Sequence, residues 1–143
     1  FGAICWLPDL EAYAEIINHY LKPGGHYVLA EFHPTLYLFD FDKQKIGYDY
    51  FEKPNMVPEE DNEEGTYTDG SEQKPSRSFF WPHSLQEVFT SFISQNLSIE
   101  SFKEYHYSPW NCFPNMKETG EREYVFGDFG VKIPHTFVLK VRK

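Results

Sequence analysis

Histidines are the residues of this sequence best suited to acid–base or metal chemistry, because imidazole titrates near neutral pH and binds transition metals. No H-x-x-H, H-E-x-x-H or C-x-x-C spacing occurs among them, so a metal-dependent hydrolase is the least supported function and we expect no metal site. Cys5 and Cys112 lie far apart without metal-type spacing, which indicates free thiols and a cytoplasmic protein. The six histidines are His19, His26, His33, His83, His106 and His135.

Two glycines in residues 21–34, LKPGGHYVLAEFHP, precede an apolar run and raise the question of a phosphate site. Such a site needs a strand, then a glycine loop, then a helix, because the anion binds N–H groups at the helix N-terminus. Here the order is reversed: a helical apolar pattern over 10–21, with Asp9 as N-cap, comes before the glycines. A helix C-terminus repels phosphate. The sequence therefore predicts a turn at Gly24 and Gly25.

The other elements follow from hydrophobic periodicity. An apolar run over 26–32 predicts a buried strand, and residues 1–7 resemble the end of another. Ser84 and Glu87 have the spacing of a capping box before a helix with apolar residues at 85, 88, 89, 92 and 93. Strands are predicted over 97–107 and 135–142. This alternation favours an α/β fold with a doubly wound, mostly parallel sheet and an antiparallel last strand.

Composition limits the possible partners. The chain has 143 residues, one domain's worth, with a formal net charge of −9 and a pI of about 5.1. An acidic chain lacks the basic surface that nucleic acid or an anionic membrane would require, and no apolar run approaches a membrane span. Aromatic residues make up 19% of the sequence, which indicates either a core of large side chains or an aromatic-walled pocket.

Two segments together are similar to a known family. WLPDL followed by a helix, then LKPGGHYVLAEFHP, resembles the second half of class I S-adenosylmethionine-dependent methyltransferases, where a helix ends in L-K-P-G-G ahead of the fifth strand. The segment over 81–116 resembles the next helix and sixth strand in a small-molecule branch. HTFVLKVRK resembles the seventh strand, antiparallel between strands five and six. The resemblance implies the distal part of a Rossmann-like methyltransferase sheet and S-adenosylmethionine as cofactor.

The resemblance also implies site residues. Residues 1–6 would be the tip of the fourth strand, so we expect Phe1, Gly2, Ala3 and Trp6 to contact the cofactor. Ligands of open α/β sheets bind beyond the carboxyl ends of strands, a rule that places Glu31, His33 and Trp6 near the active face. A methyl acceptor that must lose a proton needs a base, and the candidates are His33 and His83. Aromatic residues expected to line the acceptor site are Tyr37, Trp81, Tyr105 and Trp110.

One departure from the family keeps an alternative open. No G-x-G motif follows a strand, so we interpret the chain as a single domain that forms the C-terminal portion of a longer methyltransferase. Residues 35–82, with an acidic run over 59–64, are expected to be a lid-like insertion. The alternative is a non-catalytic interaction module with the same fold. An isolated distal half is expected to be inactive and to form a homodimer through its exposed sheet edge.

Overall fold

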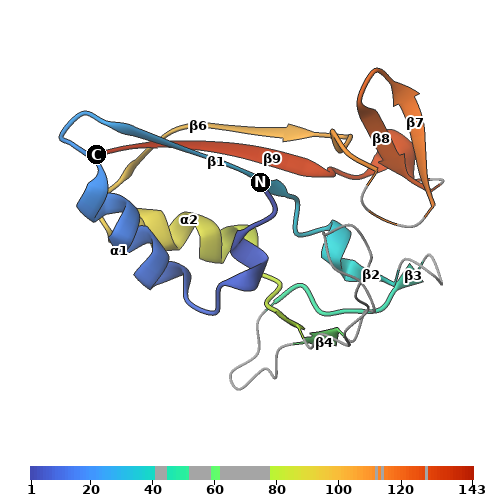
Figure 1. The fold of residues 1–143 in the computed structure, drawn as a ribbon, viewed down its shortest axis with the longest axis horizontal. Coiled ribbons are helices and arrows are strands. Elements are labelled where there is room, and N and C mark those ends of the chain that lie inside the picture. The colour runs from blue at the N-terminus through green and yellow to red at the C-terminus, as the bar shows by residue number, and fades with distance from the viewer. Residues whose placement is uncertain (41–44, 52–58, 62–77, 112, 114, 128) are drawn as a thin grey trace, which may run out of the picture.

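The computed structural model of the chain describes residues 1–40, 45–51, 59–61, 78–111, 113, 115–127 and 129–143 (Figure 1). Its central sheet has three strands, β1 (His26–Phe32), β9 (Thr136–Arg142) and β6 (Ser98–Tyr105), in the order β1-β9-β6. Two helices, α1 (Leu10–Tyr20) and α2 (Leu85–Ser94), lie on the same face of this sheet (Figure 1). The fold is therefore mixed α/β, with one layer of helices on a small sheet.

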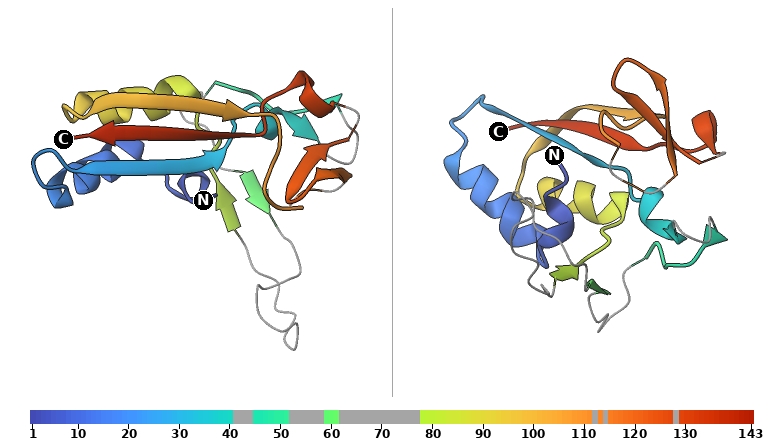
Figure 2. Two further views of the ribbon diagram at one scale, coloured as in Figure 1. Left: turned by 90° about the horizontal axis from the view of Figure 1, so that it is seen from above. Right: turned by 45° about the vertical axis from the view of Figure 1, so that its right-hand side comes forward.

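The last strand runs between the two earlier ones and antiparallel to both (Figure 2). This confirms the prediction of an antiparallel final strand. The mostly parallel sheet is not seen in the described residues, because β9 separates β1 from β6, which point the same way but do not pair. The register aligns Glu31 of β1 and Glu104 of β6 with Phe137 of β9, near the carboxyl ends of β1 and β6.

The two glycines after α1 form a turn, as predicted. Gly24 has a φ of 77° and its N–H donates to the carbonyl of Lys143 at 2.9 Å. The N–H of Gly25 donates to the carbonyl of Lys22 at 2.8 Å, and a Cβ at this position would lie 2.8 Å from that same oxygen. Both glycines are used in turning the chain from α1 into β1, so they leave no phosphate cradle.

Both helices begin at side-chain caps. Asp9 accepts a hydrogen bond from the N–H of Ala12 at 2.9 Å, and Ser84 Oγ accepts one from the N–H of Glu87 at 3.2 Å. The capping box is confirmed only in this half. The carboxylate of Glu87 instead contacts Nδ1 of His83 at 2.7 Å, and this contact replaces the reciprocal bond.

Replacing Ser84 with alanine should lower the free energy of unfolding by about 1 kcal/mol, because the first turn of α2 loses a capping acceptor. Gln86→Ala is the matched control in the same turn: its side chain is exposed, so we expect a change within about 0.5 kcal/mol. Urea unfolding of both variants measures the difference. Equal stabilities for the two would show that the cap contributes nothing.

The main core lies between the sheet and the helices. Its largest buried side chains include Phe92 of α2 and Phe137 of β9, with Leu29 of β1 and Leu139 of β9 beside them. Tyr13 of α1 and Tyr27 of β1 share a short hydroxyl–hydroxyl contact at its margin, and burial together with this contact raises the pKa of Tyr27.

Several short elements lie outside the central sheet and the two helices. They comprise the 3-10 turns η1 (Ile4–Trp6), η2 (Leu36–Leu38) and η3 (Gly130–Lys132) and the antiparallel pairs β2 (Phe39–Asp40) with β3 (Lys45–Ile46), β4 (Glu59–Asp61) with β5 (Ser78–Phe80), and β7 (Met116–Gly120) with β8 (Glu123–Phe126). Figure 1 places the β7–β8 hairpin beyond the end of the central sheet.

The expectation of a strand end at residues 1–7 was wrong. These residues contain no strand; Ile4–Trp6 form a 3-10 turn, and Glu31 accepts hydrogen bonds from the backbone of this segment. Within the acidic run over 59–64, Glu59–Asp61 pair with Ser78–Phe80. Most of the predicted lid over 35–82, including residues 62–77, lies outside the described residues.

A second, smaller core joins η2 to the β8–η3 region. Leu36, Phe39 and Phe126 are buried there, and the rings of Phe126 and Phe129 stack at 5.5 Å. His135 connects this core to β9: its Nε2 accepts the N–H of Phe126 at 2.7 Å, and its Nδ1 donates to the carbonyl of Ile133 at 3.0 Å. The ring is fully buried and its role here is structural.

The stability of the second core should depend on pH through His135. Burial lowers the pKa of His135, and protonation of Nε2 would remove the acceptor of the Phe126 N–H. A histidine in the unfolded chain titrates near about 6.5, so the unfolded state binds more protons below that pH. Stability from this group is therefore present above about pH 6.5 and is lost as the pH falls towards the folded pKa.

An NMR titration of the His135 ring measures this directly, with a midpoint expected below about 6.5. Unfolding measured at pH 7 and pH 5.5 should show lower stability at the acidic pH. A midpoint at or above the value of an unfolded histidine would contradict the structural role of the neutral ring.

Candidate functional site

The candidate site is built where β1 ends, starting with the loop that precedes α1. Glu31 is buried, and its two carboxylate oxygens lie 2.9 and 3.1 Å from the N–H of Ala3, which donates to them; the N–H of Ile4 donates at 3.3 Å. Gly2 has a φ of 67°, and its carbonyl accepts the indole N–H of Trp6 at 3.2 Å. Strand β1 thus determines the shape of this loop.

Aromatic rings from four segments meet around this loop. Phe32 lies between the rings of Phe1 at 4.8 Å and Tyr37 at 6.5 Å. Further contacts extend the row in both directions: Phe1 to Trp110 at 4.5 Å, Tyr37 to Phe80 at 4.8 Å, and Phe80 to Trp6 at 6.4 Å. Phe1, Trp6 and Trp110 are each nearly half exposed, so rings are available to a ligand on the surface.

A small internal cavity lies beneath the aromatic row. Its volume is about 10 Å³, enough for roughly one water molecule. Polar and aromatic groups share its wall, which is formed by Ile4, Cys5, Glu31, Phe32, Pro34, Tyr37, Trp81, His83 and Phe137. A substrate does not fit inside this cavity, so a ligand that contacts the aromatic row of this conformation would bind at the surface.

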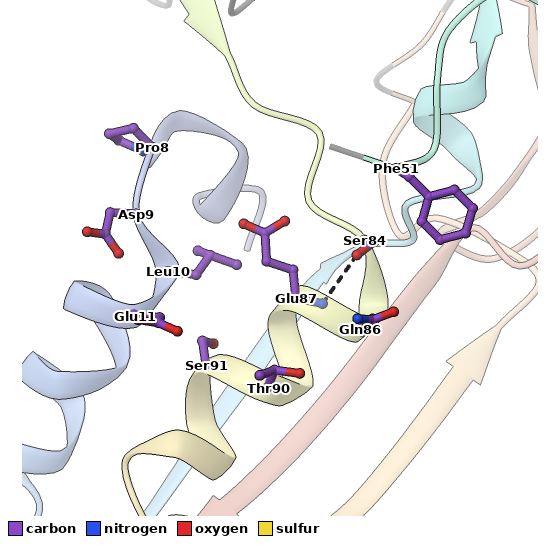
Figure 3. Close-up of a pocket in the computed structure, with 10 residues that line it drawn as sticks. All are labelled: Pro8, Asp9, Leu10, Glu11, Phe51, Ser84, Gln86, Glu87, Thr90 and Ser91. Carbon is purple, nitrogen blue, oxygen red and sulfur yellow. Dashed lines mark hydrogen bonds between the residues drawn. The ribbon is translucent and has the colours of Figure 1, made fainter. Parts of the chain in front are cut away.

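A larger groove opens between the first turns of α1 and α2 (Figure 3). Its volume is about 540 Å³, within the range of small-molecule sites. Asp9, Glu11 and Glu87 supply carboxylates, and among the lining residues that the structure describes there is no lysine or arginine. Phe51 lies across the groove from α1, and Ser84 and Gln86 lie at the start of α2 (Figure 3). The described wall of the groove therefore combines apolar side chains with acidic ones.

His83 lies between the cavity and the groove. Its Nε2 contacts the carbonyl of Leu7 at 2.7 Å and its Nδ1 the carboxylate of Glu87 at 2.7 Å. Both partners are acceptors, so the ring satisfies them only when both nitrogens carry protons. His83 therefore ties the start of α2 to the loop before α1.

His33 follows β1 and is buried against Phe137. Its Nδ1 accepts the backbone N–H of Thr35 at 3.2 Å, which places the ring proton on Nε2. Nε2 lies 2.9 Å from a carboxylate oxygen of Glu104, at an ion-pair distance. Burial lowers the pKa of His33, and the nearby Glu104 opposes this effect.

Two further titratable groups of the cavity wall are perturbed by burial. Burial raises the pKa of the Cys5 thiol to about 11, which favours the protonated thiol over the thiolate nucleophile at neutral pH. Burial also raises the pKa of Glu31, and the N–H groups of Ala3 and Ile4 oppose the rise. Within the described residues no group of three potential metal ligands occurs, and no helix could cross a membrane.

Solved structures of similar shape identify the fold. A protein from Listeria monocytogenes, provisionally assigned as an S-adenosylmethionine-dependent methyltransferase, matches 99% of the chain with a TM-score of 0.53 and 11% identity. The chain has a class I methyltransferase-like fold. It spans 58% of the length of that protein. A methyltransferase from Mesorhizobium loti matches 99% of the chain and 59% of its own length, with a TM-score of 0.49 and 12% identity. Models of protein families and curated protein sequences give no match.

Within this methyltransferase-like fold, most of the predicted site residues gather at one end of the sheet. Phe1, Gly2, Ala3 and Trp6 form the loop tied to β1, with Tyr37, Trp81 and Trp110 around it. Tyr105 lies at the same end of the sheet but apart from the loop: it ends β6, two strands away from β1, with its ring against Tyr107. His33 and His83 flank the site in separate contacts. Glu87 and Glu104, their carboxylate partners, were not predicted as site residues.

Proposed function

We propose that the chain belongs to an S-adenosylmethionine-dependent methyltransferase that acts on a small molecule and that it supplies the distal part of the enzyme. The observation that supports this most is the β1-β9-β6 topology with its reversed last strand, in a chain whose whole length follows a methyltransferase-like fold. The cofactor-binding glycine loop of such enzymes would belong to the remaining length, since the chain spans 58% of the Listeria protein.

The loop before α1 fits one end of the cofactor. Gly2 has no side chain, so a ligand can approach the backbone of the loop closely at this position. The exposed rings of Phe1, Trp6 and Trp110 offer π faces to a sulfonium cation. When bound, S-adenosylmethionine supplies an electrophilic methyl group. The proposed roles of this chain are to orient the acceptor along the aromatic row and to exclude water, with residues 35–82 as the lid.

The acceptor loses a proton when it is an amine, alcohol or thiol, and the proposed bases are His33 and His83. His83 would first have to release one of the protons that it donates to Leu7 or Glu87 before it could accept one from the methyl acceptor. In His33 the nitrogen without a proton is Nδ1, so the methyl acceptor would have to replace the backbone N–H of Thr35 there. The acidic groove between α1 and α2 favours a neutral or cationic acceptor over an anionic one.

The alternative is an interaction module without chemistry, supported by the absence of a G-x-G motif after any strand of the chain. A transfer assay separates the two. The protein at its natural length, supplied with methyl-labelled S-adenosylmethionine and a panel of small amines, phenols and thiols, should label at least one acceptor. Cofactor binding without transfer to any acceptor, in the same preparation, would favour the module.

We also propose that the isolated chain pairs with a second copy through β1, which lies at one edge of the described sheet. An unpaired strand edge presents N–H and C=O groups to which another strand can add. Sedimentation velocity over a range of concentrations should show a dimer at the higher ones. A monomer throughout would refute pairing at this edge.

A further inference from the structure

Glu31 is a buried carboxylate on a strand whose neighbouring positions belong to the main core. It lies in β1 two residues after Leu29 and is paired with Phe137 of β9, both of which belong to the main core. Its residue is 1% exposed, and within the part of the chain that the structure describes it forms no ion pair with lysine or arginine. An apolar side chain would fill this position at lower cost, because burying a carboxylate without a counter-charge is unfavourable.

The compensation for this burial comes from the loop before α1. Both oxygens of Glu31 accept the N–H of Ala3, and one of them also accepts the N–H of Ile4. Bonds from backbone N–H groups to a carboxylate are charge-assisted and stronger than those between neutral groups. The three contacts join positions 28 and 27 residues apart in sequence, so they fix the loop to the sheet rather than stabilising a local turn.

The conformation held in this way determines where the exposed rings lie. Gly2, immediately before the bound amides, has a φ of 67°, and a Cβ there would lie 3.3 Å from the ring of Phe32. Its carbonyl receives the indole N–H of Trp6, and the carbonyl of Cys5 receives the backbone N–H of Trp81 at 2.8 Å. A change in the loop at Ala3 would therefore move both tryptophans.

We infer that Glu31 is a positioning residue, which holds residues 2–4 and the ring of Trp6 in the arrangement that binds the cofactor. This inference rests on the proposed function. Glu31 itself is covered by the loop and does not need to touch a ligand, so its effect is exerted through the backbone of Ala3 and Ile4.

Two variants test the inference. Glu31→Gln keeps the shape of the side chain but replaces one acceptor oxygen with a donor, and Glu31→Asp keeps the charge but shortens the reach. Glu100→Gln is the matched control on β6, where the carboxylate pairs with Lys140 at 2.7 Å and has no contact with the loop. Leu29→Ala is the control for lost stability, because it creates a cavity in the same strand.

The first readout is hydrogen exchange at the amides of Ala3 and Ile4 in the 143-residue chain, which needs no cofactor. We expect exchange at least about tenfold faster in Glu31→Gln, a smaller acceleration in Glu31→Asp, and none in Glu100→Gln. Unchanged protection in both Glu31 variants would overturn the inference. Should Glu31→Gln fail to fold, Glu31→Asp carries the same comparison.

The second readout is the affinity of the natural-length protein for S-adenosylhomocysteine. We expect the affinity of Glu31→Gln to fall about tenfold or more. Leu29→Ala, whose stability should be lowered to a similar extent, should keep the wild-type affinity. Binding by the wild type and equally by Glu31→Gln would overturn the inference and leave the proposed function intact. No binding by the wild type would overturn the proposed function, and with it the cofactor role of Glu31, whatever the exchange experiment shows.

Discussion

Replacing Phe137 with alanine should lower the free energy of unfolding by about 3–5 kcal/mol. Phe137 is fully buried in the central strand β9, where its ring lies 5.8 Å from that of Phe102 and also forms part of the cavity wall beside Glu31. Alanine would leave a void between the sheet and the helices that β9, held on both edges, cannot close by moving. Since a domain of this size has about 5–15 kcal/mol of stability, the variant should be only marginally folded.

Urea unfolding followed by circular dichroism measures this change. Phe137→Leu, which removes less volume, should cost about 1–2 kcal/mol and keeps the comparison possible should the alanine variant not fold. Ile93→Ala is the control, because Ile93 in α2 is 56% exposed. A cost for Phe137→Ala no greater than that of the control would mean that β9 is not the centre of the core.

Replacing Phe126 with alanine should cost about 3 kcal/mol or more, but in the second core. Phe126 is fully buried at the end of β8, between the ring of Phe39 at 5.9 Å and that of Phe129 at 5.5 Å. The backbone N–H of Phe126 also donates to His135, the residue that links this core to β9. Because the two cores share few buried side chains, we expect the loss to fall mainly on β7, β8 and η3.

Hydrogen exchange resolves the two cores in one experiment. In Phe126→Ala, amides of β7 and β8 should exchange much faster, while those of β9 keep most of their protection. Val131→Ala, at a position 75% exposed in η3, provides the control. A uniform loss of protection across the chain would show that the two cores unfold as a single unit.

The elements that the sequence predicts well are those in which a hydrophobic pattern continues over seven or more residues. The helix over 10–21, the strand over 26–32, the helix from 85 and the last two strands occur within two residues of their expected positions. Their apolar faces all pack into one core, so local pattern and tertiary burial agree. The turn at Gly24 and Gly25 was predictable because glycine favours both of the conditions found there: a positive φ at Gly24 and close contact with the carbonyl of Lys22 at Gly25.

The short elements were not predictable in the same way. The β7–β8 hairpin lies between the predicted strands over 97–107 and 135–142, where the sequence predicts no further strand, and its signal was a glycine at 120 between short runs of mixed polarity. The 3-10 turn at Ile4–Trp6 depends on hydrogen bonds to Glu31, which lies far away in sequence. Apolar residues 1–7 look like a strand because nothing in their own pattern reveals that distant acceptor.

Some residues of the candidate site were also predictable from the sequence, and others were not. A carboxylate within an apolar strand marks Glu31 as unusual from the sequence alone, and the rule for strand ends places it near the site. Glu87 and Glu104 carry no such signal, because each is one of many acidic residues on amphipathic elements. Only the fold places them beside His83 and His33.

The central claim is that this fold binds S-adenosylmethionine, and calorimetric titration tests it most directly. S-adenosylmethionine and S-adenosylhomocysteine would be titrated into the 143-residue chain and into the chain extended upstream by its natural sequence. We predict binding to the extended protein and little or none to the shorter chain. Absence of binding in both forms would contradict the methyltransferase assignment and favour an interaction module.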